Sequence, residues 1–193
     1  MTTKTYQIKI ALQGSRPKIW RRILVPSDLL LPDFHKIIQT TMGWTNSHLH
    51  QFIKNRTFYS LKMEEDDFWE DMDNVDYSEI KVSDLLKKID DKIVYEYDFG
   101  DGWEHDIILE KIEKDGTNEN IPTCLAGKNN CPPEDCGGVW GYINMLEVLK
   151  DPSHEEYDEY VYWLGDEFDP AYFNITEINE MLEMEDFGCF DLF

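Results

Sequence analysis

The chain has 193 residues, of which 41% are hydrophobic, 13% are aromatic and 30% are charged, with a formal net charge of −22. This apolar content excludes a disordered chain, and the length suffices for one domain spanning residues 1–193. No apolar run reaches the roughly 18 residues of a membrane span, and the first residues lack a signal region, so we expect a cytoplasmic protein without a membrane partner.

Charge is divided unevenly along the chain. Residues 1–62 carry ten Lys or Arg against two Asp, whereas residues 63–193 carry eight basic residues against 38 acidic ones. We expect the basic part to lie beside the acidic part and to be partly neutralised by it. A basic face for nucleic acid is the alternative, which the net charge disfavours. That face would consist of Arg16, Lys18, Arg21, Arg22, Lys36, Lys54 and Arg56.

The first predicted elements are a hairpin and a helix. Residues 5–13 alternate between apolar and polar side chains, and residues 18–25 follow after a turn as a second strand, which predicts an antiparallel hairpin. Residues 32–42 then repeat apolar side chains at helical spacing. Pro32 suits the first turn of this helix, and Gly43 ends it.

A second hairpin is predicted over residues 48–53 and 57–59. In this hairpin His48 and His50 would occupy alternate positions and share one face of the strand. Residues 64–76 contain eight acidic residues and predict a mobile acidic insert rather than a packed element.

A third hairpin, over residues 92–113, is expected at the centre of the sheet. Later apolar stripes at helical spacing begin near Val139, Tyr157 and Ile178, and predict a helical C-terminal part. We therefore predict an α+β fold: an antiparallel sheet of hairpins in the N-terminal 113 residues, one early helix, and helices near the C-terminus.

Three of the four cysteines are Cys124, Cys131 and Cys136, among prolines and glycines that predict a loop rather than a core strand or a helix. In a reducing compartment such a cluster favours a metal site, and zinc takes four thiolate or imidazole ligands. Apolar packing of the thiols, or a disulfide between the last two, is the alternative. Candidates for a fourth zinc ligand are His105, His154, His48, His50 and Cys189.

A second constellation combines histidines and aspartates on the predicted hairpins. Imidazole and carboxylate groups at the ends of neighbouring strands could form a metal or acid/base site. A hydrogen-bonded structural role is the alternative for each of them. The candidate catalytic residues are His48, His50, Asp98, Asp101 and His105.

Seven groups of residues occur in a characteristic order: residues 6–10, residues 19–22, His35 with residues 43–44, residues 47–52, residues 97–101 with Trp103 and His105, residues 131–138 with Gly141 and Tyr142, and residues 168–170. Together they resemble the plasmid pRiA4b ORF-three-like family over about residues 6–173. The resemblance implies an association with mobile elements and supplies no catalytic residues.

The absence of nucleotide-loop and nucleophile motifs favours a non-enzymatic interaction module with a protein partner. In this interpretation the loop from Cys124 to Gly138 is fixed by a structural metal, with zinc as the candidate, or by its own turn hydrogen bonds. The acidic insert docks on a basic partner. The first alternative is a metal-dependent hydrolase acting on nucleotides or nucleic acid through the histidine and aspartate constellation. The second is an acidic protein that mimics DNA.

Overall fold

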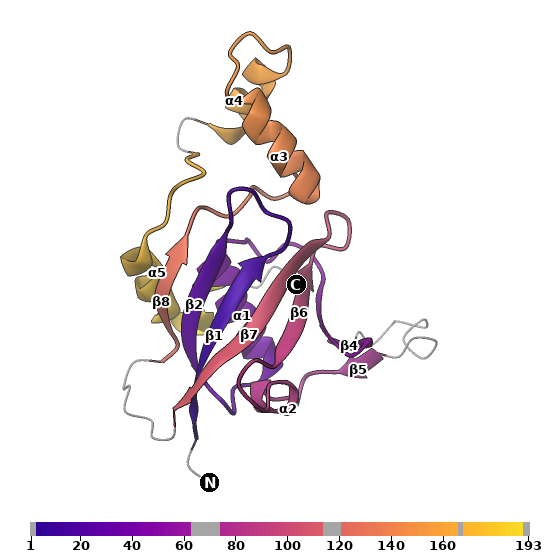
Figure 1. Ribbon diagram of the computed structural model, residues 1–193, viewed down its shortest axis with the longest axis vertical. Helices are drawn as coiled ribbons and strands as arrows, with labels where there is room; N and C mark the ends of the chain where they lie inside the picture. Colours follow the sequence, from indigo (N-terminus) through magenta and orange to yellow (C-terminus); the bar gives the residue numbers. More distant parts are fainter. Residues whose placement is uncertain (1–2, 63–73, 114–120, 166–167, 191–193) are drawn as a thin grey trace.

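The structure, a computed structural model, describes residues 3–62, 74–113, 121–165 and 168–190. Its centre is one eight-stranded sheet with the strand order β5-β4-β3-β6-β7-β1-β2-β8 (Figure 1). Helices cover part of the sheet, so the predicted α+β fold is confirmed. The strands are β1 (Thr5–Leu12), β2 (Trp20–Pro26), β3 (His50–Lys54), β4 (Thr57–Ser60), β5 (Asn74–Asp76), β6 (Lys92–Tyr97), β7 (Trp103–Glu113) and β8 (Thr123–Lys128).

The three predicted hairpins form antiparallel strand pairs. β1 pairs with β2, β3 with β4, and β6 with β7, and the β6–β7 pair occupies the middle of the sheet as expected. Alternate residues of β1 point into the core, where Ile8 and Ile10 are fully buried. Ile8 lies opposite Ile23 of β2, so apolar side chains on neighbouring strands continue one buried layer.

Helix α1 (Leu31–Met42) covers this buried layer, and Phe34, Ile37 and Ile38 lie on its buried side. The helix begins at a proline-containing first turn and ends at Gly43 in the left-handed conformation, as predicted. Helix α5 (Ile175–Leu182) packs beside α1 and against the edge strand β8 (Figure 1). The short helix α2 (Val82–Leu85) precedes β6.

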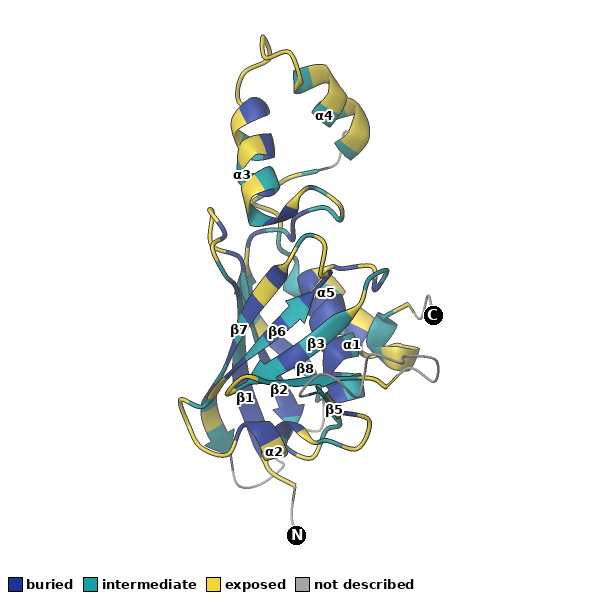
Figure 2. Ribbon diagram, turned by 90° about the vertical axis from the view of Figure 1, so that its right-hand side faces the viewer, coloured by how far each residue is buried: buried dark blue, intermediate teal, exposed yellow. Residues whose placement is uncertain are grey.

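Helices α3 (Gly138–Val148) and α4 (Tyr157–Leu164) project beyond one end of the sheet (Figures 1 and 2). We call residues 138–164 the α3–α4 arm. Tyr142 and Met145 bury the near side of α3, whereas α4 has no buried residue. The far part of the arm is therefore largely exposed.

Two segments differ from the sequence-based expectations. Residues 123–128 form the edge strand β8, so Cys124 lies on a strand and not in the predicted loop. This strand lacks apolar alternation and forms because the outer edge of β2 offers unpaired backbone groups. Residues 74–76 of the predicted acidic insert form β5, which pairs in parallel with β4 and makes the sheet mixed. The rest of that insert, residues 64–73, lies outside the described residues.

Among the described ranges, no helix combines the length and the apolar character that crossing a bilayer requires.

Gly138 provides a test of how α3 is joined to the sheet. Its φ is +66°, and a Cβ atom there would lie 2.4 Å from the carbonyl oxygen of Asp101. Gly102 has a similar φ of +65° but open space around it. We expect Gly102→Ala to lower the free energy of unfolding by about 1 kcal/mol from backbone strain alone. Gly138→Ala should lower it by about 3 kcal/mol, because the clash adds to the strain. Equal losses in urea unfolding would contradict the close approach.

Candidate functional site

Sheet pairing brings residues from three distant segments to one end of the sheet. His50 of β3 lies opposite Tyr97 of β6, so His48, just before β3, lies beside Asp98, just after β6. The backbone N–H of Asp98 donates to the carbonyl of Leu49 at 2.9 Å, which fixes this approach. The loop between β8 and α3 adds two further carboxylates.

The Nε2 atom of His48 faces three carboxylates. It lies 3.8 Å from Oδ2 of Asp98, 3.6 Å from Oε2 of Glu134 and 3.5 Å from Oδ1 of Asp135. His48, Asp98 and Asp135 offer ligand atoms that all lie within 4.8 Å of one another, and they are the one such group in the described ranges. We call these residues, together with Glu134, the His48 centre.

Two carboxylates of the centre are held by their other oxygen atoms. Oε1 of Glu134 accepts hydrogen bonds from the backbone N–H of Thr45 at 2.8 Å, from the Thr45 hydroxyl at 2.9 Å and from the Tyr97 hydroxyl at 3.1 Å. Oδ1 of Asp98 accepts from the N–H of Gly100 at 3.0 Å. The remaining oxygen of each carboxylate is thus oriented toward His48, as an outer ring of hydrogen bonds orients metal ligands.

The distances in this centre fit a shared cation better than direct hydrogen bonds. Nε2 of His48 and Oε2 of Glu134 are buried and make no hydrogen bond to any described residue. Their separation of 3.6 Å exceeds that of a normal hydrogen bond. Two ligand atoms bound about 2.1 Å from one tetrahedral metal ion lie about 3.4 Å apart. The imidazole of His48 and the carboxylates of Asp98 and Asp135 could therefore hold a divalent cation, with Oε2 of Glu134 adjacent to them.

His50 does not join this centre, although the sequence analysis grouped it with His48. β3 begins at His50, so the prediction that both histidines lie on one strand face is wrong for His48. The His50 ring stacks on His35 with centroids 3.4 Å apart and makes a short hydrogen bond with the Tyr77 hydroxyl. Burial and the neighbouring His35 hold the pKa of His50 well below its usual value. It is a neutral core residue.

His105 and Asp101 are also separate from the His48 centre. The His105 side chain is completely buried, and its Nδ1 lies 3.0 Å from the carbonyl oxygen of Trp103. Burial lowers the pKa of His105 to about 4. Asp101 accepts a hydrogen bond at 3.1 Å from the N–H of Gly137, which fastens the start of α3 to the β6–β7 turn.

The three predicted zinc ligands lie near a buried arginine. The four cysteines form no disulfide among the described residues, and no cysteine belongs to a group of converging metal ligands there. Burial raises the pKa of Cys124 and of Cys136, the latter to about 12, and raises that of Cys131 well above its usual value. Zinc deprotonates the thiols that bind it, so these raised pKa values describe a three-thiolate site without its metal. That site stays a prediction, as does His154 as its ligand.

The Arg21 guanidinium interacts electrostatically with the thiols of Cys124 and Cys131. It is buried, and its Nε donates to the Thr41 carbonyl at 2.5 Å. The positive charge of the Arg21 guanidinium disfavours binding of a metal cation by the same cysteines, because the two charges repel. Burial also removes Arg21 from the predicted basic face.

Ion pairs partly neutralise the basic N-terminal part, as expected. Arg22 pairs with Glu110 at 2.6 Å and Lys36 with Asp186 at 2.7 Å, each joining the basic segment to the acidic one. Two residues of the basic face considered for nucleic acid, Arg22 and Lys36, are therefore paired with acidic side chains.

The two carboxylates that sequence reasoning missed, Glu134 and Asp135, stand inside the cysteine-rich segment. Because cysteines stand on both sides of these two acids, the sequence analysis considered sulfur ligands and not the carboxylates. The available signal was a pair of adjacent acids after Pro132-Pro133, in a loop rigid enough to position them.

Comparisons with known proteins find relatives of undefined activity. The family model described as "Plasmid pRiA4b ORF-3-like protein" matches residues 4–177. The uncharacterised protein y4hQ of Sinorhizobium fredii (strain NBRC 101917 / NGR234) is 36% identical over 188 residues, covering 95% of this chain and 93% of that protein. The crystal structure of the protein of unknown function MM3350 from Methanosarcina mazei Go1 has a TM-score of 0.80 and 40% identity, covering 92% of this chain and 98% of the other.

The buried His105 should make the fold sensitive to acid. Between its folded pKa of about 4 and its usual value of 6.5, the unfolded chain binds a proton that the folded chain excludes. The free energy of unfolding should therefore fall as the pH drops through this window, by up to about 3 kcal/mol from this group. His105→Gln should be less stable than the wild type at pH 7.5 but should lose less stability on acidification, as measured by urea unfolding. The exposed His154→Gln is the control, and an unchanged pH slope in His105→Gln would refute the assignment.

Proposed function

This chain belongs to the plasmid pRiA4b ORF-3-like family, and we propose that it is a metal-dependent hydrolase whose cation is bound by His48, Asp98, Glu134 and Asp135. The observation that carries the proposal is the buried Nε2 atom of His48, which lacks a hydrogen-bond partner among the described residues and faces three carboxylates at 3.5–3.8 Å. The matched family span contains all four residues.

The ligand set favours a cation of intermediate hardness. Carboxylate oxygens suit Mn²⁺ and Mg²⁺, whereas imidazole suits Zn²⁺ and other transition metals, so Zn²⁺ or Mn²⁺ fits the mixture. The Asp135 side chain is 75% exposed, which leaves the centre accessible to solvent on that side. A catalytic metal site keeps such an open position for water or substrate.

Hydrolysis is the chemistry that we propose for this site. A bound divalent cation lowers the pKa of its water toward neutrality and stabilises the negative charge that develops on the substrate. Hydrogen bonds from Thr45 and Tyr97 would orient the carboxylate of Glu134, and the one from Gly100 would orient that of Asp98. Held in this way, the carboxylates would leave the Nε2 atom of His48 free to bind the cation. Phosphate esters of nucleotides are the proposed substrates, because the cation would supply a local counter-charge on a chain of net charge −22.

Metal titration of matched variants tests the centre. We expect the wild type to bind one Zn²⁺ or Mn²⁺ in calorimetry, and His48→Gln and Asp98→Asn to weaken binding by at least about a hundredfold, because each removes a ligand. His154→Gln and Cys136→Ser should bind as the wild type does. Chelation should abolish any hydrolysis of p-nitrophenyl phosphate and bis(p-nitrophenyl) phosphate, and re-addition of the metal should restore it.

Each contrary result has a defined meaning. If Cys136→Ser loses the metal and His48→Gln keeps it, the cation belongs to the cysteines and the His48 centre is refuted. If the metal binds at His48 but no ester is hydrolysed in a broad screen, the site is structural and the hydrolase proposal fails.

A second candidate function, a protein-interaction module, is favoured by the exposed aromatic side chains of the α3–α4 arm. Trp140 of α3 is 83% exposed, and Tyr162 and Trp163 of α4 are 92% and 47% exposed. Aromatic side chains are enriched at interfaces, where they supply large contact areas. The arm also carries exposed acidic side chains, which favour a basic partner. These acids are Asp151, Glu155, Glu156, Asp158 and Glu159.

The arm can be tested by capture at low salt. Immobilised wild type should retain a specific partner that is lost with the double variant Tyr162→Ser/Trp163→Ser, because the apolar contact is removed while the charge is unchanged. Ile89→Ser, which alters an exposed apolar side chain elsewhere, should retain it. Equal capture by all three proteins would show that the arm is not the contact surface.

A further inference from the structure

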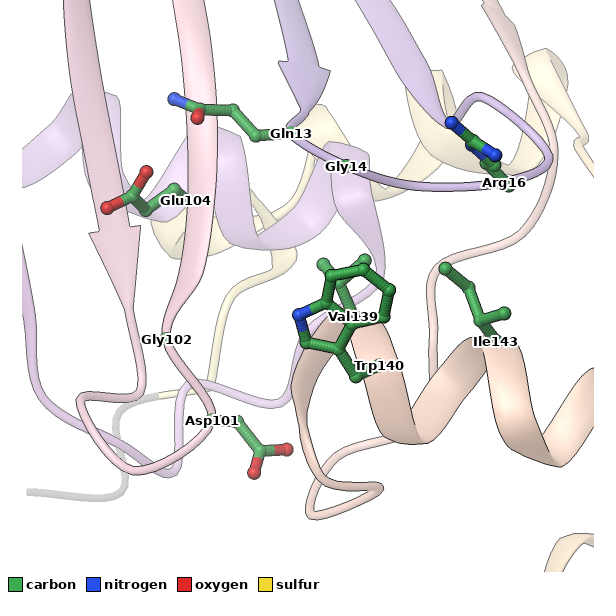
Figure 3. A pocket seen from close by; sticks show the side chains of 9 residues that line it. All are labelled: Gln13, Gly14, Arg16, Asp101, Gly102, Glu104, Val139, Trp140 and Ile143. Atoms are coloured by element: carbon green, nitrogen blue, oxygen red, sulfur yellow. The ribbon is translucent and has the colours of Figure 1, made fainter.

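A cleft of about 530 Å³ lies where the foot of α3 meets two turns of the sheet (Figure 3). Its walls come from the β1–β2 turn, the β6–β7 turn and the first turns of α3, and its volume is typical of a site for a small molecule or a single large side chain. The His48 centre involves a different part of the β6–β7 turn, so the cleft is a separate feature.

Close contacts fix the walls of this cleft. A Cβ atom on Gly14 would lie 3.2 Å from a methyl group of Val139, so the β1–β2 turn packs closely on α3. The Gly137–Asp101 hydrogen bond and the close approach of Gly138 fasten α3 to the β6–β7 turn. The cleft is therefore largely preformed, which reduces the entropy cost of binding.

The cleft is lined by one aromatic side chain, two acidic side chains and one basic side chain. Trp140 stands beside Val139 in the cleft and Asp101 lies near the foot of α3, whereas Glu104 lies on the strand side with its carboxylate directed away from Trp140 in this view (Figure 3). Trp140 remains 83% exposed, so most of its indole is available to a ligand. Two carboxylates and an indole attract a cation, which also benefits from the field of a chain with net charge −22.

Arg16 is the one basic side chain among the described residues that line the cleft, and its charge limits which ligands can bind there. Arg16 lies on the β1–β2 turn, near Ile143 rather than near Asp101 (Figure 3). A run of basic side chains would meet this guanidinium and be repelled, whereas one basic side chain can stay at the acidic side. A guanidinium stacks flat on an indole and forms paired hydrogen bonds with carboxylates, which an ammonium does not.

We propose that this cleft binds the side chain of one arginine from a partner protein, with the guanidinium against Trp140 and within the electrostatic field of Asp101 and Glu104. The inference rests on the second candidate function, the protein-interaction module, and is independent of the metal. The inference names an arginine side chain as the group that is bound and places the contact at the start of α3.

Nuclear magnetic resonance can locate binding directly. The chain has six tryptophans, and the indole N–H signals of Trp140 and Trp163 can be assigned by their loss in Trp140→Phe and Trp163→Phe. The probe is the peptide acetyl-Ala-Arg-Ala-amide, with acetyl-Ala-norleucine-Ala-amide as the uncharged control. We expect the arginine peptide to shift the Trp140 signal with a Kd on the order of 1 mM, and the norleucine peptide to shift it far less.

Charge variants separate the cleft from general attraction. Glu104→Gln should raise the Kd at least about threefold, whereas Glu155→Gln, on the arm but outside the cleft, should leave it unchanged. Equal effects of both variants, equal shifts with both peptides, or a Trp140 signal that responds to adenosine monophosphate but not to the arginine peptide would each overturn the inference. A response confined to Trp163 would overturn it while leaving the arm as an interaction surface.

Discussion

The hydrogen bonds of Glu134 join the loop before α3 to the sheet, and most of the functional geometry depends on them. One oxygen of this carboxylate accepts from Thr45 and Tyr97, which belong to the segment after α1 and to β6. The other oxygen then faces His48. This arrangement brings the acids of the cysteine-rich segment into the His48 centre, and the same loop leads directly into α3, the arm and the cleft.

Burial gives the histidines different chemistry. His50 and His105 have side chains enclosed by aromatic residues, and burial holds their pKa values below the usual range. His48 lies at the end of the sheet, where the neighbouring carboxylates favour a bound metal cation. The same side chain thus stabilises the core in its neutral form at two positions and offers a ligand at the third.

Long, regular elements could be predicted from the sequence, whereas short ones could not. The hairpins containing β1 and β7 and the helix α1 show sustained periodicity with clear turn residues, and all three were predicted. β5 has three residues and β8 contains Gly127, so neither shows a strand pattern by itself. Each forms because a neighbouring strand offers its edge, which is a three-dimensional condition.

The site was predictable in part for a related reason. His48 and Asp98 were both identified, because hairpin ends bring residues together across a sheet. Glu134 and Asp135 were not, because no local pattern shows that their loop returns to this end of the sheet. Burial, which distinguishes His105 from a ligand, depends on packing that a single sequence does not display.

Arg21 has a consequence for how the molecule responds to its surroundings. Its guanidinium is held by the backbone carbonyls of Trp20, Thr41, Met42 and Lys128, and it stacks on the Phe173 ring. Carbonyl oxygens do not take up protons in the physiological range, and mobile ions compete poorly for a buried donor. The contacts of Arg21 that join β2, α1 and β8 should therefore change little in strength with pH or ionic strength. The surface charges of the same protein respond strongly to both.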